Sequence, residues 1–238
     1  MPNLNICLHN IVANPSEIKN IYDLTTDQLE KVFSLCEQAC LDLSLDYVNY
    51  YFDDGYVSFK TQIAQKSWNI PRHRLIVAVV TESIGSDSKL SDKDIRRLYN
   101  DGFGIVPHGV SHAALAVFDE TDKLLGTPTD TSTYRNSIYG KSIALNSSEV
   151  LFQLTESRKQ LKSVEPMVSF SEFVLPYGLY NEQTILIARQ AEYERLLTCH
   201  SGIDNGQFLA PRHLITQNNI STLESDLRNL STSFKTLI

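Results

Sequence analysis

The sequence has 238 residues, 42% of them hydrophobic and 9% aromatic, which is long and apolar enough for one domain spanning residues 1–238. Its formal net charge of −7 offers no basic face to follow a phosphate backbone, which argues against nucleic acid as a partner. No apolar stretch is long enough to span a membrane, and the first residues lack the basic start of a secretory signal, so we expect a cytoplasmic protein.

The first part of the chain alternates strand-like with helix-like segments. Thr25-Thr26-Asp27-Gln28 resembles a capping box and is followed by apolar residues at helical spacing as far as Leu43. The aromatic and β-branched run 47–52 ends at Asp53-Asp54-Gly55, which is typical of a strand that enters a turn. The continuous apolar run 75–80 indicates a parallel strand buried on both faces. In this part we predict strands at 4–8, 47–52 and 75–80 and helices at 29–43 and 58–68.

The same alternation continues through the rest of the chain. Ser91-Asp92-Lys93-Asp94 begins a helix with acidic residues in its first turn, where they favour the helix dipole. Residues 119–141 are rich in Thr, Asp and Gly without periodicity, and a loop of that length is often functional. In this part we predict strands at 103–106, 173–175 and 196–199 and helices at 91–100, 147–161, 181–194 and 221–234, with residues 208–210 leading into Pro211-Arg212-His213.

Repeated β-then-α units predict a parallel sheet. Three short segments follow directly after predicted strands: Asp53-Asp54, His108 and Pro176-Tyr177-Gly178. In barrels built from such units, the C-terminal ends of the strands carry the chemistry. We therefore expect these segments to meet on one rim.

The four cysteines are scattered and form no C-x-x-C pair, which argues against a zinc knuckle. Cys36 and Cys40 lie one helical turn apart within an apolar stripe, so we expect them to be core thiols. The other two, Cys7 and Cys199, stand far apart in the sequence. This cysteine usage points to a reduced compartment, in keeping with the cytoplasmic expectation.

Asp53-Asp54, together with His108 and His112, supplies the parts of a metal-dependent hydrolase. One carboxylate and both imidazoles can hold a divalent metal, while the other carboxylate takes a proton from the attacking water. The spacing of the two histidines places both imidazoles on one side of a helical turn. Each pair alone has a plainer explanation, as a D-D-G turn or as two unrelated histidines. Their occurrence on one rim favours metal ligation.

Three further segments are less specific. Pro176-Tyr177-Gly178 is explained either by a strand-ending turn or by a backbone N–H that meets a developing oxyanion, with the Tyr177 ring as a pocket wall. His9 follows the first predicted strand, and His213 follows Pro211-Arg212. For a lone histidine, a structural role is the ordinary explanation.

These motifs resemble those of the polysaccharide deacetylase family, carbohydrate esterases that remove N-acetyl or O-acetyl groups. Tyr51-Phe52-Asp53-Asp54-Gly55-Tyr56 is similar to the first motif of the family, of the T-F-D-D-G type. His108-Gly109-Val110-Ser111-His112 is similar to the second, H-x-x-x-H. Residues 173–182, F-V-L-P-Y-G-L-Y-N-E, are similar to the F-A-Y-P-Y-G-x-Y-N-E form of the third. The order and spacing also fit, over nearly the whole chain.

The resemblance implies an α/β fold, an irregular (β/α)7 barrel. By the same resemblance, Asp53 corresponds to the catalytic base, and the Tyr177 position in Pro176-Tyr177-Gly178 corresponds to the backbone amide of the oxyanion hole. The metal ligands that the resemblance implies are Asp54, His108 and His112.

The sequence departs from the family pattern at two places. Many members carry an Arg two residues before the Pro of the third motif, where this chain has Val174; the P-Y-G branch also lacks that Arg. The C-terminal L-x-x-H-D segment that usually supplies the general acid does not occur in this sequence. In one branch an N-terminal Y-H-x-I-like segment supplies that His, and Cys7-Leu8-His9-Asn10-Ile11 is similar to it. We therefore expect His9 to be the acid, with His213 as the alternative. Pro211-Arg212 resembles a late P-R element of that branch, which would place Arg212 and His213 at the rim.

The sequence thus predicts a metal-dependent hydrolase that removes an acetyl group from a sugar or glycan precursor. We expect one divalent metal ion, zinc by preference, with cobalt, nickel or iron as alternatives. Two other functions remain open. One is a metal-dependent hydrolase of a non-carbohydrate amide, because fold and ligands do not fix the substrate. The other is a catalytically silent carbohydrate-binding relative, against which the intact set of Asp53, Asp54 and both histidines argues.

Overall fold

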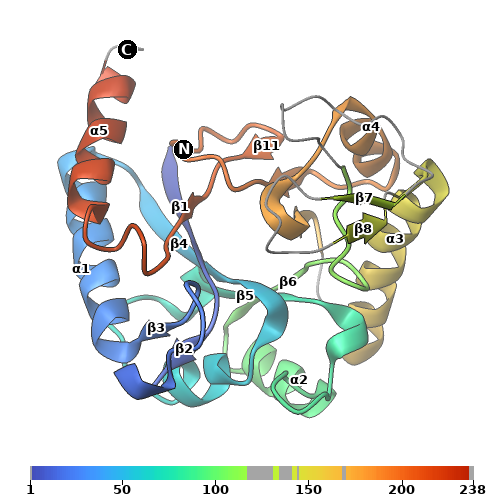
Figure 1. The fold of residues 1–238 in the computed structure, drawn as a ribbon, viewed down its shortest axis with the longest axis horizontal. Helices are drawn as coiled ribbons and strands as arrows, with labels where there is room; N and C mark the ends of the chain where they lie inside the picture. The colour runs from blue at the N-terminus through green and yellow to red at the C-terminus, as the bar shows by residue number, and fades with distance from the viewer. Residues whose placement is uncertain (1, 117–130, 134–140, 144, 168–169, 236–238) are drawn as a thin grey trace.

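The structure is a computed structural model that describes residues 2–116, 131–133, 141–143, 145–167 and 170–235. Its parallel strands surround a common interior, and its helices lie outside them (Figure 1). No helix within the described ranges has both the length and the hydropathy that crossing a bilayer requires.

The strands form two parallel sheets. In the larger sheet the order is β12-β1-β4-β5-β6, and in the smaller it is β11-β10-β9. Each ladder in both sheets is parallel, as the alternation of strands and helices predicts. The bounds of the larger sheet are Asn3–Leu8 (β1), Tyr47–Phe52 (β4), Leu75–Val79 (β5), Gly104–Pro107 (β6) and His213–Leu214 (β12). Those of the smaller are Glu172–Val174 (β9), Arg195–Leu197 (β10) and Leu209–Ala210 (β11).

The two sheets share one apolar interior, to which strands of both contribute. Its buried members come from β4, β5 and β6 on one side and from β9, β10 and β11 on the other. They are Tyr51, Ile76, Ala78, Val106, Val174, Leu197 and Ala210. Side chains alternate between the two faces of a strand, so the residues next to these face outward. The predicted α/β barrel architecture is therefore confirmed.

The ring of hydrogen bonds around this interior is interrupted in two places among the described residues. No ladder joins β6 to β9, although His108, just beyond β6, donates a hydrogen bond to the carbonyl of Val174 in β9. No ladder joins β11 to β12, which are consecutive segments separated by Pro211 and Arg212. Proline has no backbone N–H to offer a ladder. If β11 and β12 are counted as one interrupted strand, the barrel has seven parallel strands among the described residues.

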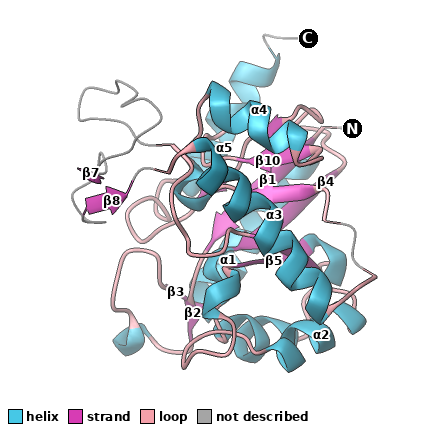
Figure 2. Cartoon of the chain, turned by 90° about the vertical axis from the view of Figure 1, so that its right-hand side faces the viewer, coloured by secondary structure: helices cyan, strands magenta, loops and turns pink. Residues whose placement is uncertain are grey.

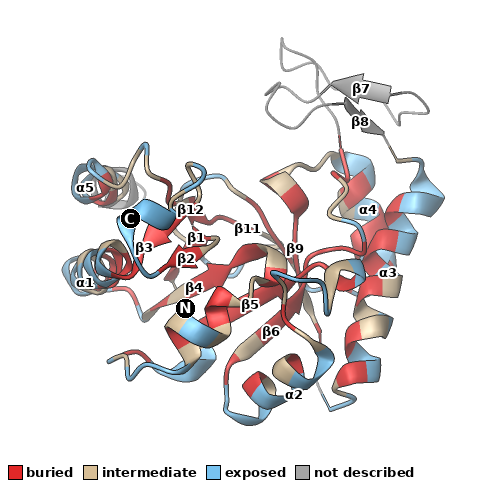
Figure 3. Cartoon of the chain, turned by 60° about the horizontal axis from the view of Figure 1, so that its bottom comes forward, coloured by how far each residue is buried: buried red, intermediate tan, exposed pale blue. Residues whose placement is uncertain are grey.

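The helices cover the outside of the larger sheet and flank the smaller one. A continuous core fills the space between the outward faces of β1, β4 and β5 and the helices, and it includes Leu4, Tyr50 and Val77. In Figure 3 the buried residues follow the strands and the inner helix faces, while the outer faces are exposed. The helices are Thr26–Asp42 (α1), Asp92–Asn100 (α2), Ser147–Val164 (α3), Glu182–Gln190 (α4) and Leu223–Lys235 (α5).

The predicted helices and strands are found close to their expected positions. The capping box before α1 is confirmed, since the Thr25 hydroxyl accepts from the Gln28 N–H and the Gln28 side chain accepts from the Thr25 N–H. Cys36 and Cys40 are buried on the inner face of α1, as predicted.

Three elements differ from the predictions. The segment predicted as a helix over 58–68 is a short π-helix, Phe59–Ala64. The sequence did not predict the short parallel pair of Ile11–Val12 (β2) and Leu24–Thr25 (β3). The loop predicted over 119–141 lies mostly outside the described residues. Within it and just beyond it, Thr131–Thr133 (β7) pairs antiparallel with Lys141–Ile143 (β8), and both are labelled in Figure 2.

Candidate active site

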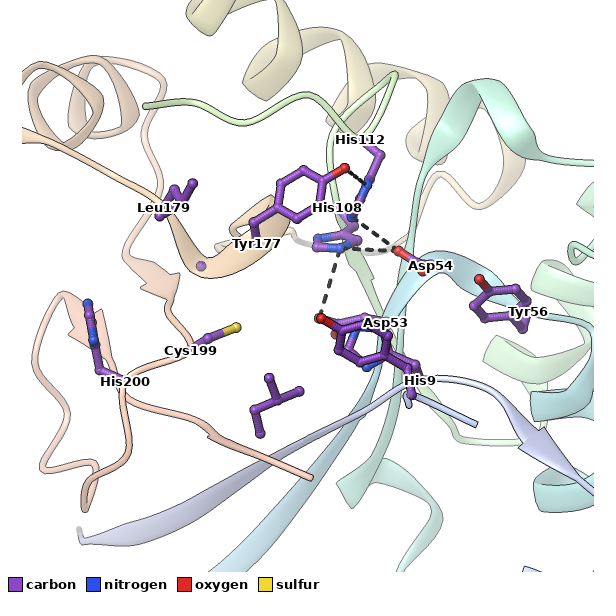
Figure 4. A pocket seen from close by; sticks show the side chains of 13 residues that line it. His9, Asp53, Asp54, Tyr56, His108, His112, Tyr177, Leu179, Cys199 and His200 are labelled. Atoms are coloured by element: carbon purple, nitrogen blue, oxygen red, sulfur yellow. Dashed lines mark hydrogen bonds and ion pairs between the residues drawn. The ribbon is translucent and has the colours of Figure 1, made fainter. Parts of the chain in front are cut away.

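A cavity of about 440 Å³ opens where the larger and smaller sheets present the C-terminal ends of their strands. The side chains around it come from the ends of β1, β4, β6, β9 and β10, as the rim prediction requires (Figure 4). Most of the predicted site residues line this one cavity: His9, Asp53, Asp54, His108, His112, Tyr177 and Gly178.

The two adjacent carboxylates both reach this cavity because the chain turns sharply after β4. Asp53 continues the inward alternation that includes Tyr51 and is only 3% exposed. Asp54 has a left-handed backbone, with φ of 72°, which turns the second carboxylate toward the same side. Aspartate tolerates this conformation better than most residues, and Gly55, with φ of 66°, continues the turn.

Asp54, His108 and His112 converge on one point. Asp54 Oδ1 lies 3.2 Å from Nε2 of His112 and 3.6 Å from Nε2 of His108. One ligand atom from each of the three lies within 4.8 Å of the others. These distances between the ligand atoms suit a single cation held by the three residues.

The second ring nitrogen of each histidine, Nδ1, takes part in a hydrogen bond with another residue. Nδ1 of His108 donates to the carbonyl of Val174 over 2.9 Å, so Nε2 is the ring nitrogen that faces the Asp54 carboxylate. Nδ1 of His112 hydrogen-bonds with the Tyr177 hydroxyl over 3.0 Å. Such outer hydrogen bonds fix the orientation of imidazole ligands in metal sites.

The donor set fits a divalent cation. Asp54 Oδ1 is buried and makes no hydrogen bond among the described residues, so a charged acceptor faces two imidazoles without a donor of its own. Burial raises the pKa of Asp54, but His108 and His112 outweigh it, and the pKa is lowered overall. Burial and the neighbouring His108 lower the pKa of His112 to about 4. An ionised carboxylate and a neutral imidazole are the forms that ligate metal.

The prediction that His108 and His112 share a helical turn is wrong. The segment after β6 is an irregular loop, in which Gly109 has φ of 83° and His112 has φ of 56°. Gln153 of α3 shapes the loop: its Oε1 accepts from the N–H groups of Val110 and Ser111 over 2.8 and 3.1 Å. The hydrogen bonds from the loop to Gln153 hold it in the shape that brings the two imidazoles together. Gln153 is buried on the inner face of α3, which the sequence alone did not indicate.

Arg212 contacts the catalytic-base candidate directly. Its Nη1 donates to Asp53 Oδ1 over 2.7 Å and its Nη2 donates to Oδ2 over 3.1 Å. The Arg212 side chain is fully buried, and its Nε donates to the carbonyl of Thr198. Burial raises the pKa of Asp53, but Arg212 and then His108 outweigh it, so the pKa is lowered overall. From the sequence we predicted only that Arg212 would lie at the rim, and its pairing with Asp53 was not predicted.

His9 and His213 face opposite sides of the barrel wall. His9 lines the cavity, with its ring 4.7 Å from that of Tyr22, and its buried Nδ1 has no hydrogen-bond partner in the part of the chain that the structure describes. His213 pairs with Ile6 of β1, which belongs to the outer core, and paired residues of parallel strands point to the same face. His213 Nδ1 hydrogen-bonds with the Ser201 hydroxyl over 2.8 Å. The rim placement expected for His213 is therefore not found, whereas that of His9 is.

Pro176-Tyr177-Gly178 forms a tight turn directly after β9, as predicted. Tyr177 has φ of 59°, and its ring lies 4.5 Å from that of His112, so it forms a wall of the cavity. A Cβ on Gly178 would lie 2.6 Å from the backbone nitrogen of Cys199, so only glycine allows this close approach. Among the described residues, five non-glycine residues have positive φ, and three of them are Asp54, His112 and Tyr177. Strained backbone of this kind clusters at functional sites.

Comparisons with known proteins agree with this geometry. The sequence model of the polysaccharide deacetylase family matches residues 43–196. No curated protein sequence matches the chain.

Three solved structures have a similar fold. A de-N-acetylase from Aggregatibacter actinomycetemcomitans is 18% identical with a TM-score of 0.67, and the match covers 94% of this chain and 99% of that one. The deacetylase PplD from Streptococcus pyogenes, in complex with acetate, is 19% identical with a TM-score of 0.65, covering 95% and 98%. IcaB from Ammonifex degensii is 16% identical with a TM-score of 0.64, covering 94% and 96%.

Proposed function

The chain belongs to the polysaccharide deacetylase family, and from that membership and the cavity described above we propose that it is a metal-dependent hydrolase that removes an acetyl group from a carbohydrate or glycan precursor. One observation carries the proposal. In a single cavity, Asp54, His108 and His112 converge as a ligand set while the neighbouring Asp53 is held ionised by Arg212.

Asp54, His108 and His112 would hold the metal ion. A divalent cation bound there would activate the attacking water and polarise the acyl oxygen. One carboxylate and two imidazoles suit zinc, and also cobalt, nickel or iron. The Val174 carbonyl and the Tyr177 hydroxyl fix the ring orientation of the two histidines.

Asp53 acts as the general base. It is ionised because Arg212 binds both of its oxygens, and it adjoins the ligand Asp54 at the end of the same strand. Its carboxylate therefore takes the proton of the attacking water. The Arg212 fork fixes the plane of the carboxylate, so the base meets the water in one orientation.

His9 acts as the general acid, from a position in the lining of the same cavity. It protonates the leaving nitrogen or oxygen when the tetrahedral intermediate collapses. The backbone N–H of Tyr177 donates a hydrogen bond to the developing oxyanion. His213 has no such role because it faces the outer core.

The walls of the cavity suit a sugar ring. Tyr22, Tyr56 and Tyr177 line it, and tyrosines combine an apolar face with a polar hydroxyl. Two of the similar structures are a de-N-acetylase and a deacetylase in complex with acetate, which supports acetyl as the group removed. The complete set of ligands, base and acid favours an enzyme over a silent binding relative.

Acetate release tests this function. The full chain is incubated with a panel of N-acetylated and O-acetylated sugars and oligosaccharides, with a metal chelator and then with zinc, cobalt or nickel restored. We expect acetate from at least one sugar, its loss on chelation and its return with metal. Asp53→Asn is the control for contaminating esterase. Release that survives chelation would overturn the metal dependence, and release only from non-carbohydrate amides would overturn the substrate class.

A further inference from the structure

Two of the four cysteines meet at the floor of the active-site cavity. Cys7 lies on the inward face of β1 and is fully buried, whereas Cys199, just after β10, is partly exposed and lines the cavity. Both sulfurs lie against the same ion pair, that of Asp53 and Arg212. Figure 4 shows the Cys199 sulfur pointing toward the side of the cavity that carries Asp53. All four cysteines of the chain are free thiols in the structure.

The same two thiols contact the ion pair that tunes the base. The Cys7 sulfur lies 3.4 Å from Asp53 Oδ2, as a hydrogen-bond donor. Arg212 Nη2, which donates to that same oxygen, also lies 3.6 Å from the Cys199 sulfur. The four side chains form one cluster of successive contacts, in which Cys199 is on the side of the guanidinium and Cys7 on the side of the carboxylate.

In this arrangement the pKa values of the two thiols shift in opposite directions. The neighbouring Cys7 thiol, together with the charge of Arg212, outweighs burial and lowers the pKa of Cys199 to about 7. The neighbouring Cys199 sulfur and then burial raise the pKa of Cys7. A thiolate is the reactive form of cysteine, so the accessible sulfur is the nucleophile and the buried one keeps its proton. Burial raises the pKa of both Cys36 and Cys40, on α1, and for Cys40 the charge of Arg74 offsets this only in part.

We propose that Cys199 and Cys7 form a peroxide-sensitive dithiol at the floor of the active site, in which Cys199 is oxidised first and Cys7 then closes a disulfide with it. The inference goes beyond the proposed function, since the disulfide forms whether or not an acetylated sugar is the substrate.

The chemistry needs one hydroperoxide as oxidant. The Cys199 thiolate attacks a peroxide oxygen, so an S–O bond forms, the O–O bond breaks and hydroxide leaves and takes up a proton as water. The Cys7 sulfur then attacks the Cys199 sulfur, so the S–S bond forms and the S–O bond breaks. The leaving hydroxyl takes the Cys7 proton and departs as the second water. The two thiols lose two electrons in total, and the peroxide gains them.

The disulfide would disturb both parts of the catalytic machinery that rest on these thiols. Asp53 would lose the Cys7 S–H donor, and Arg212 would lose the thiolate beside its Nη2. Cys199 also packs directly against Gly178, so its displacement moves the turn that carries Tyr177. If the proposed function holds, we therefore expect oxidation to suppress acetate release and a dithiol reductant to restore it.

Peptide mass mapping tests the proposal without any measurement of activity. The full chain, loaded with one equivalent of zinc, is treated with a small excess of hydrogen peroxide, quenched and digested without reductant. We expect a cross-linked peptide pair containing Cys7 and Cys199, lighter than the free thiols by two hydrogen atoms and separated again by dithiothreitol. Cys36 and Cys40 serve as internal controls and remain free thiols.

Variants separate the roles of the two sulfurs. In Cys7→Ser the sulfenic acid on Cys199 should persist and be trapped by a cyclic 1,3-dione; Cys7→Ala is used if the serine variant does not fold by circular dichroism. In Cys199→Ser, Cys7 should not react, and Cys36→Ser should respond as the wild type does. Free Cys7 and Cys199 in the wild type after peroxide, or direct passage of Cys199 to the sulfinic acid, would overturn the proposal. A disulfide without any acetate release would instead leave it standing and count against the proposed function.

Discussion

Arg212 holds both oxygens of Asp53 in a fork of two hydrogen bonds, of 2.7 and 3.1 Å, across 159 positions of sequence. Neither partner reaches solvent to any extent. Removing one member of a buried pair typically costs about 3–5 kcal/mol, because the other is left as an uncompensated charge. The pair therefore links the segment before β12 to the turn after β4, and it also favours the ionised form of the proposed base.

Arg212→Lys should lower turnover by about 10²-fold, toward the lower end of what loss of a general base costs. Lysine keeps the positive charge but lacks the planar fork, so the Asp53 carboxylate is no longer fixed and its pKa rises. A base works only when deprotonated, so the acidic limb of kcat/KM should move to higher pH. Metal content, measured by elemental analysis, should not change.

Arg195→Lys is the matched control for that variant. Arg195 pairs with Glu172 and Asp204, away from the cavity, so its replacement should leave the acidic limb in place. An equal shift in both variants would mean that Arg212 acts through general stability and not through Asp53.

The two adjacent carboxylates should respond differently to the same substitution. Asp53→Asn should retain metal and lose about 10²–10⁴-fold in turnover, because only the base is removed. Asp54→Asn should lose metal affinity as well, because its Oδ1 is the oxygen that faces both histidines. Metal titration and steady-state rates measure the two effects. Identical behaviour of the two variants would contradict the division of labour.

Tyr177→Phe removes the hydroxyl that hydrogen-bonds with Nδ1 of His112. Loss of such an outer partner typically costs about 10–100-fold in metal affinity or activity. We expect weaker zinc binding in competition with a chromogenic chelator, with the fold retained. Tyr193→Phe, which loses a hydrogen bond to the carbonyl of Leu154 far from the cavity, is the control and should bind zinc as the wild type does.

His9→Ala should slow an amide substrate much more than an activated ester, because the ester leaving group needs no proton. Metal content should stay constant, since His9 is not a proposed ligand. His213→Ala should show no such dependence on the leaving group, because its side chain faces the outer core. If the two variants exchanged these responses, the acid would be His213.

The pH dependence of kcat/KM should be a bell displaced toward acid. Burial lowers the pKa of His9, and the carboxylates of Asp53 and Asp54 offset this only in part, so it lies below the ordinary value of 6.5. An acid works only while protonated, so the rate should fall as pH rises through that lowered pKa. Asp53, with its lowered pKa, keeps the base active at low pH. An alkaline limb above pH 6.5 that persists in His9→Ala would contradict this assignment.

The sequence was sufficient to predict the parts of the site that follow from local patterns. The run 47–52 ends at Asp53-Asp54 in the structure as in the prediction, because an aromatic, β-branched strand followed by D-D-G is a strong local signal. The rim placement of His9 and His108 follows from the same rule, since parallel strands present their C-terminal ends together.

The remaining parts depend on long-range packing that local patterns do not encode. The pairing of Arg212 with Asp53 requires the register of a strand only two residues long, and a slip of one residue would have exchanged Arg212 with His213 on the inner face. The loop between His108 and His112 is shaped by Gln153 from a later helix. No spacing rule predicts such support, and for this reason the helical prediction was wrong.

The break between β11 and β12, at Pro211 and Arg212, also bears on the order in which the residues of the site are synthesised. The three proposed ligands all precede residue 113, whereas the guanidinium that pairs with the proposed base belongs to Arg212, directly before β12, the strand that pairs with β1. A nascent chain therefore carries the whole ligand set long before it carries the partner of Asp53. In the order of synthesis, the proposed ligands therefore come first, and the partner of the proposed base follows about a hundred residues later.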